Sequence, residues 1–166
     1  MTALLITLAA VGVVAIALFF AWATRGLPHT LETLEPAVRA LLRQGYDGGF
    51  LTIDVAHEKK FVQLRKYIHS RGNYGIELGF PQAEWSAEYY TKLRELCDDE
   101  SMSYRVSRAS GTDDPLEFLF VDFGKDYSEA TIFVRRVLKE VMDVPSEARL
   151  YCKHANGTGE DRLIDS

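Results

Sequence analysis

The sequence predicts an α+β fold, in which an N-terminal transmembrane helix is followed by one domain with helices packed on an antiparallel sheet. Three observations lead to this prediction. Residues 4–22 are apolar apart from Thr7, and every charged residue comes after them. Residues 51–80 alternate between apolar and polar side chains, which is typical of strands with one buried face. Apolar residues recur at helical spacing on either side of these strands, without the βαβ rhythm of a parallel sheet.

The composition limits the classes of protein to consider. The 166 residues match one ordinary domain with a short appendage. The 19 Lys and Arg and the 24 Asp and Glu residues give a net charge of −5, all of it outside the apolar segment. A mildly acidic chain does not support general nucleic-acid binding, so no nucleic-acid partner is expected. Two cysteines, Cys97 and Cys152, are too few for a disulfide scaffold.

The apolar segment has the length of a membrane span. Roughly 20 helical residues cross a hydrocarbon core of about 30 Å, and residues 4–22 supply this run with Thr7 as its one polar residue. Trp22 suits the membrane–water interface, and Arg25 follows as a charged flank. We therefore expect residues 1–24 to form a lipid-embedded anchor and residues 25–30 to form a short linker.

A cleaved signal peptide is the alternative to an anchor. Residues 21–23 read Ala-Trp-Ala, which resembles a cleavage site. However, residues 1–3 carry no Lys or Arg, and the apolar run exceeds the length of about 7–15 residues expected of a signal peptide. These two departures favour the anchor.

The flanking cations predict the orientation of the anchor. None precedes the helix, whereas Arg25 and Arg39 follow it, so the positive-inside rule favours a single-pass protein of the inner or plasma membrane with a cytoplasmic domain. A domain on the periplasmic or extracellular side is the alternative. Gly12, Ala17 and Ala21 offer small residues for helix pairing, but no GxxxG motif is present, so a homo-oligomer is left open.

The domain is expected to cover residues 31–145 and to begin with a helix. Thr33 is the predicted N-cap, and Gly45 ends this helix. Three strands then form a meander with a polar bend at residues 57–60 and a turn at residues 71–73. The side chains predicted to face the core are Leu34, Val38, Leu41, Leu42, Leu51, Ile53, Val55, Val62, Leu64, Ile68, Tyr74, Ile76, Leu78 and Phe80.

The second half of the domain repeats these patterns. A second helix is predicted over residues 83–98, a fourth strand near Tyr104 and a fifth, central strand over residues 116–123. Asp126 begins a last helix through a capping box with the Glu three positions later. The predicted core-facing side chains of these helices are Trp85, Tyr89, Leu93, Leu96, Cys97, Ala130, Val134, Val137, Leu138 and Val141. Residues 146–166 keep no sustained period and are expected to form a mobile tail.

The resulting order of elements, α-β-β-β-α-β-β-α, resembles the type III secretion chaperone-like fold, an α+β family whose members mostly bind other proteins. The resemblance covers about residues 31–142 and rests on element order alone, because no motif matches. It implies a compact domain that binds protein, and no functional residue is carried over. That family is typically soluble, so the anchor is a departure from it. A ferredoxin-like variant is the competing topology.

The sequence carries no motif for catalysis, for a cofactor or for a metal. The four histidines, His29, His57, His69 and His154, form no HxH or HxxxH pair. The glycines match neither the dinucleotide-binding fingerprint nor the P-loop. Acidic neighbours of Cys97 would raise the pKa of its thiol, which is unsuited to a nucleophile. We therefore expect no catalytic residue, no cofactor and no metal site.

The second strand of the meander is basic and aromatic. If Val62 and Leu64 face the helices, the alternate residues of this strand must share the open face of the sheet. Basic residues beside aromatic residues on an open sheet suit an acidic partner or lipid headgroups. The predicted interaction face is therefore Phe61, Gln63, Arg65 and Tyr67, together with Lys59 and Lys60. The alternative is an ordinary solvated face.

These observations predict a membrane-anchored, non-catalytic binding or adaptor domain, an accessory subunit of a membrane-associated protein complex. Its expected partners are lipid, through the anchor, and another protein. An exported or outward-facing immunity, inhibitor-type or envelope protein is the first alternative. An enzyme of unrecognised type that uses scattered groups such as His57, His69 and Asp122 is the second.

Overall fold

The computed structural model describes residues 27–108 and 116–155. The strands are β1 (Leu27–His29), β2 (Phe50–Val55), β3 (Phe61–Ser70), β4 (Asn73–Pro81), β5 (Tyr104–Arg108), β6 (Glu117–Asp122) and β7 (Leu150–Ala155). The helices are α2 (Glu35–Gln44), α3 (Ala87–Asp99) and α4 (Tyr127–Arg136), with a 3-10 turn η1 (Leu31–Thr33) before α2 and a π-helical turn η2 (Val137–Val141) after α4.

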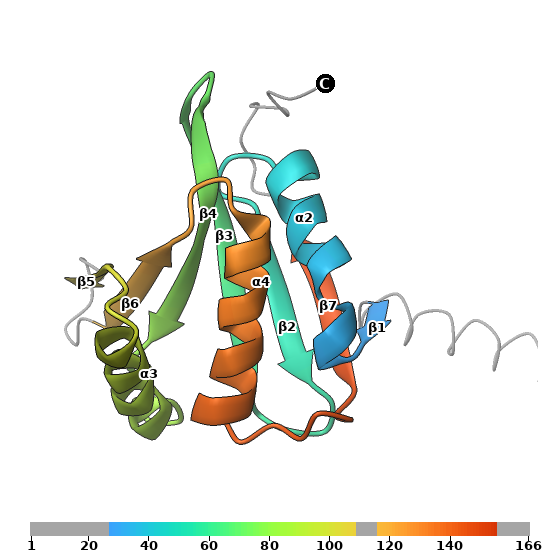
Figure 1. The fold of residues 1–166 in the computed structure, drawn as a ribbon, viewed down its shortest axis with the longest axis vertical. Coiled ribbons are helices and arrows are strands. Elements are labelled where there is room, and N and C mark those ends of the chain that lie inside the picture. The colour runs from blue at the N-terminus through green and yellow to red at the C-terminus, as the bar shows by residue number, and fades with distance from the viewer. Residues whose placement is uncertain (1–26, 109–115, 156–166) are drawn as a thin grey trace, which may run out of the picture.

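The described strands form one 7-stranded sheet in the order β1-β7-β2-β3-β4-β6-β5, and every neighbouring pair is antiparallel. Figure 1 shows α2 and α4 packed side by side over one face of this sheet, with α3 nearer to β6 and β5. The α+β class, the antiparallel sheet and the meander of β2, β3 and β4 are thus confirmed. In the described part of the chain no helix has both the length and the apolarity to cross a bilayer. The predicted anchor with its flanks, Trp22 and Arg25, lies outside the described residues.

The core lies between the sheet and the helical layer. Alternate side chains of the strands point toward the helices, because successive residues of a strand face opposite sides of a sheet. Every predicted core residue of the meander is buried except Ile68, which is partly buried against the core. The helices contribute fully buried side chains from Leu34, Val38, Leu93, Ala130, Val134, Val137 and Leu138.

Two strands depart from the predicted order. β1 forms in the segment expected to be a linker, and β7 forms within the residues expected to be a tail. β7 pairs with β1 on one side and with β2 on the other, and it buries Leu150 and Cys152. Its remaining residues are polar or partly exposed, so the apolar alternation is too short to stand out in the sequence. The rest of the predicted tail, residues 156–166, lies outside the described residues.

Two helix starts also differ from the prediction. Thr33 ends η1, and the N-cap of α2 is Leu34. α3 begins at Ala87 because the Ser86 hydroxyl donates a hydrogen bond of 2.6 Å to the Pro81 carbonyl and so holds a turn before the helix. Trp85 therefore lies in this turn, 39% exposed.

The predicted capping box of α4 is half formed. The Asp126 carboxylate accepts a hydrogen bond of 2.8 Å from the Glu129 backbone N–H, as expected of an N-cap. The backbone N–H of Asp126 donates to the carbonyl of Phe123 at 3.0 Å, in place of the reciprocal bond of a capping box.

Candidate functional site

The sheet face opposite the helices is the candidate site. The predicted facing of β3 is confirmed: Val62 and Leu64 are fully buried under the helices, and the alternate residues lie on the other face. Phe61, Gln63 and Tyr67 are half-buried there, and Arg65 is exposed. The sequence therefore placed four of its predicted interaction residues on one surface.

The two predicted lysines lie apart from this surface. Lys59 and Lys60 belong to the bend before β3, where the Lys60 ammonium lies 2.7 Å from the Glu58 carboxylate. The hydrogen bond that the Lys60 ammonium donates to the Glu58 carboxylate raises the pKa of Lys60. Lys66 points into the core, where its ammonium donates to the Leu42 carbonyl at 2.5 Å. The basic residues around β3 therefore do not form one patch.

The Phe61 side chain packs against another aromatic ring, a contact that the sequence does not indicate. Its ring centroid lies 4.9 Å from that of Trp85, which the turn before α3 carries to the end of the sheet. Aromatic pairs at this distance contribute about 0.5–1.5 kcal/mol beyond their buried area. Phe61 thus supports the fold as well as lining the open face.

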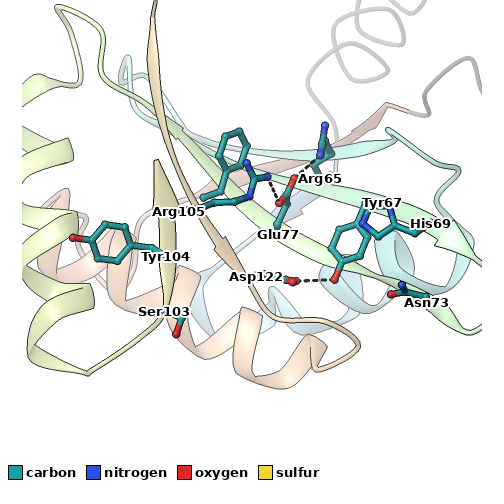
Figure 2. Close-up of a pocket in the computed structure, with 10 residues that line it drawn as sticks. Arg65, Tyr67, His69, Asn73, Glu77, Ser103, Tyr104, Arg105 and Asp122 are labelled. Atoms are coloured by element: carbon teal, nitrogen blue, oxygen red, sulfur yellow. Dashed lines mark hydrogen bonds and ion pairs between the residues drawn. The ribbon is translucent and has the colours of Figure 1, made fainter. Parts of the chain in front are cut away.

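A buried carboxylate organises the centre of the open face. Glu77 on β4 is 3% exposed, and two guanidinium groups reach it from opposite sides (Figure 2). Arg65 Nη2 lies 2.6 Å from Glu77 Oε1, and Arg105 Nη2 lies 2.8 Å from Glu77 Oε2. The Arg105 contact is a hydrogen bond, whereas Oε1 has an ion pair without an aligned hydrogen bond. Half of each arginine side chain remains exposed, at 50% and 55%.

Arg105 is also held by an aromatic ring. Its guanidinium carbon lies 3.9 Å from the ring centroid of Phe120, the residue that pairs with it on β6. The Phe120 ring in turn lies over Gly79, where an added Cβ would come within 3.2 Å of it. Cation–π contact and the ion pair to Glu77 together fix the position of Arg105.

A second polar pair lies next to Glu77. The Tyr67 hydroxyl donates a hydrogen bond of 2.8 Å to Asp122 (Figure 2). The same carboxylate oxygen accepts a bond of 2.8 Å from the Gly124 backbone N–H. Partial burial and the bond to Asp122 raise the pKa of Tyr67 to about 12. Tyr67 reaches Asp122 by crossing Gly75, where a Cβ would lie 2.5 Å from the phenol oxygen.

These contacts shape a trough along β4. Because Gly75 and Gly79 flank Glu77 on the open face, Glu77 is the one side chain that β4 places on this face between positions 75 and 79. Two adjoining hollows result, and they share Arg65 and Phe120. The Glu77 hollow has a volume of about 560 Å³ and is lined by Arg65, Tyr67, His69, Asn73, Glu77, Ser103, Tyr104, Arg105, Phe120 and Asp122. The Gly79 hollow has a volume of about 330 Å³ and is lined by Gln63, Arg65, Gly79, Ser107, Arg108, Phe118 and Phe120.

The structure brings together some of the scattered polar groups and separates others. His69 and Asp122 both line the Glu77 hollow, whereas His57 lies in the bend between β2 and β3. The raised pKa of Tyr67 extends the protonated state of this phenol to still higher pH. Within the described residues no group of His, Cys, Asp and Glu side chains could hold a metal ion.

The two cysteines lie away from the trough and are buried. Burial, with a smaller contribution from Asp98, raises the pKa of the Cys97 thiol to about 11. Burial and the nearby Asp54 raise the pKa of Cys152 to about 12. Both thiols are therefore protonated near neutral pH, a state in which they are poor nucleophiles.

Four residues of the two hollows were not predicted from the sequence: Glu77, Arg105, Phe118 and Phe120. One signal for Glu77 was present, because glycines two positions before and after it leave a carboxylate alone on one strand face. The signal for Arg105 was absent, since its contact with Glu77 depends on the order of strands in the sheet.

Comparisons of the chain with family models, curated proteins and solved structures find no match. The resemblance to the type III secretion chaperone-like fold therefore stays a prediction based on element order.

Proposed function

We propose that the protein is a membrane-anchored, non-catalytic binding module, an accessory subunit of a membrane-associated complex. It binds another protein through the open face of its sheet. The observation that carries this proposal is the trough, in which Arg65 and Arg105 are held in place by one buried carboxylate. Arginine and aromatic residues in preformed hollows are typical of the residues that dominate binding energy in protein interfaces.

The arrangement of charges supports binding over a purely structural role. A buried ion pair adds little stability relative to apolar residues of similar size, because both charges must be desolvated. Here Glu77 holds two guanidinium groups whose outer halves stay exposed. Because Glu77 orders both arginine side chains in the free protein, less side-chain entropy is lost when a partner binds.

The proposed anchor keeps this surface close to the bilayer. β1 begins at Leu27, so Trp22 at the end of the apolar run is followed by a very short connection. A fully extended chain between these residues spans at most about 18 Å. The domain therefore meets partners that are themselves in or near the membrane.

Affinity purification tests this proposal. A tagged full-length chain is recovered from gently solubilised membranes as the wild type, as Arg65→Gln/Arg105→Gln and as Arg43→Gln. Arg43 is an exposed arginine on α2, in the helical layer, and serves as the matched control. We expect the wild type and the control to recover the same partner, and the double variant to lose it. Recovery of the wild type alone, or equal recovery by all three proteins, would contradict the proposal.

The side of the membrane decides which partners the domain can meet. Cys97 and Cys152 are buried, so an impermeant maleimide needs an exposed cysteine such as Glu58→Cys in the bend before β3. In the proposed cytoplasmic orientation this variant is labelled only after the cells are permeabilised. Labelling of intact cells would favour the outward-facing immunity or envelope protein.

A further inference from the structure

We propose that the Gly79 hollow binds a carboxylate that the partner protein carries next to a large apolar side chain, on an extended segment lying along β5. This inference rests on the proposed function, because it specifies which chemistry the open face recognises. The Gly79 hollow has a volume of about 330 Å³, which falls within the range of about 300–1,000 Å³ that is usual for ligand pockets.

The walls of the Gly79 hollow are cationic and aromatic. Arg65 and Arg108 form its rims, while the rings of Phe118 and Phe120, with centroids 6.0 Å apart, form one side. None of the described residues that line it is a carboxylate. The hollow therefore matches a group with a negatively charged end and an apolar body.

Both rim arginines have donors to offer a ligand. Arg65 contacts Glu77 through Nη2, and Arg108 lies 3.5 Å from Glu117 through Nε. A guanidinium carries five N–H donors, so each of these pairs uses only part of its capacity. Arg108 follows Ser107 on β5 and pairs with Glu117, so its side chain leaves the strand on the helix side of the sheet. It is the last residue of β5 and its side chain is 73% exposed, so it can turn around the edge of the sheet toward a bound carboxylate. Paired N–H groups bind carboxylates in a planar, bidentate geometry.

The two charged residues that line the Gly79 hollow in the described chain, Arg65 and Arg108, are both cationic. Their carboxylate partners, Glu77 and Glu117, have side chains that are only 5% and 22% exposed, and neither lines the hollow. A partner carboxylate that enters the hollow therefore meets positive charge, which a neutral group would leave unused.

The edge of the sheet favours an extended protein segment as the occupant. In the described chain β5 pairs only with β6, and four of its five residues are exposed. Its outer edge can therefore accept an added strand. Ser107 on β5 is small and lines the hollow, so a side chain from an added strand can pass over it to reach Phe118. A bilayer surface is flat and would contact only the rims of this concave site.

A peptide-binding experiment tests the inference. The full-length chain is held in nanodiscs of zwitterionic lipid and titrated with two labelled Gly/Ser peptides, one carrying Phe-Glu pairs and the other Phe-Gln pairs. We expect the Phe-Glu peptide to bind at least about tenfold more tightly, as charge-assisted hydrogen bonds require. Arg65→Gln and Arg108→Gln should each weaken its binding about tenfold, and Arg43→Gln should leave it unchanged. Gly79→Val, which fills the floor of the hollow, should also weaken binding.

Several results would overturn the inference. These are equal binding of the two peptides, no detectable binding at millimolar concentration, or unchanged binding by both arginine variants. Binding of the chain to anionic vesicles, in place of the Phe-Glu peptide, would identify a lipid surface as the occupant. If Arg65→Gln fails to fold, the exposed Arg108 still provides the decisive variant. The affinity purification could recover a partner although the Phe-Glu peptide does not bind. That combination would support the proposed function and reject only the ligand chemistry inferred for the Gly79 hollow.

Discussion

Glu77 shows how one residue determines the chemistry of the open face. It is the only side chain that β4 adds between Gly75 and Gly79, and it fixes two arginines from other strands. Replacing it by Gln keeps the shape but removes the charge. Glu77→Gln should lower the free energy of unfolding by about 1.5 kcal/mol, which is the scale of hydrogen bonds to charged groups. Urea titration measures this change, with the exposed Glu95→Gln on α3 as the control; equal stability of the two variants would contradict the role of Glu77.

Gly75 and Gly79 are a matched pair on the same face of β4. A Cβ at Gly75 would lie 2.5 Å from the Tyr67 oxygen and 2.7 Å from the backbone of Gly124, neither of which can move easily. A Cβ at Gly79 meets only the Phe120 ring, at 3.2 Å. Gly75→Ala should therefore destabilise the domain by about 2 kcal/mol, as overpacking does, and Gly79→Ala by clearly less. A larger loss for Gly79→Ala in urea titrations would mean that the Tyr67 contact is absent.

Among the elements, α4 depends most clearly on a single local contact. The Asp126 carboxylate satisfies one N–H group of its first turn, at Glu129. Asp126→Ala should cost about 1 kcal/mol of stability, as the loss of an N-cap usually does. Ser128→Ala, an exposed change in the same turn, should cost clearly less. Equal thermal midpoints for the two variants would show that Asp126 does not cap the helix.

Elements with a long and regular period could be predicted from the sequence. β2, β3 and β4 alternate over their whole length, and the buried faces of α2 and α4 recur at helical spacing. Where a pattern is short or mixed, tertiary contacts determine which element forms and where it begins. β7 has only Leu150 and Cys152 to indicate a buried face. Trp85 keeps the helical spacing of α3, yet the hydrogen bond from Ser86 to Pro81 holds a turn there, and the helix begins only after it, at Ala87.

The candidate site could be predicted only in part for a similar reason. Alternation assigns Phe61, Gln63, Arg65 and Tyr67 to one face of β3, and the structure confirms that face. It does not say which strand lies on the far side of β4. The ion pair between Glu77 and Arg105 requires β6 and β5 to follow β4 in the sheet, which depends on packing of the whole domain.

At the scale of the whole molecule, folding raises the pKa values of two thiols and two phenols. The pKa of Cys97 rises from 9.0 to about 11 and that of Cys152 from 9.0 to about 12, chiefly through burial. The pKa values of Tyr67 and Tyr90 rise from 10.0 to about 12 through burial and hydrogen bonds to Asp122 and Glu117. The unfolded chain loses these protons at lower pH than the folded chain does. The contribution of these four groups to stability is therefore fully present below about pH 9 and is lost as the pH rises from about 9 toward 12.

Urea titrations of the full-length chain in detergent at about pH 8 and about pH 10.5 measure this fall in stability. We expect a lower free energy of unfolding at the higher pH. The Cys152→Ala variant should show a smaller decrease between the two pH values, because it lacks one of the shifted groups. An unchanged free energy of unfolding across this range would contradict the burial of these groups.

The central claim is that a sheet with all its described helices on one face uses the other face to bind a protein. Photo-crosslinking in intact membranes tests it most directly. Benzoylphenylalanine replaces Ser107, on the open face beside the Gly79 hollow, or Ile132, which is 57% exposed on α4 in the helical layer. We predict a protein adduct from position 107 that disappears in the Arg65→Gln/Arg108→Gln background, and none from position 132. An adduct from position 132 with none from position 107 would place the partner on the helices and contradict the claim.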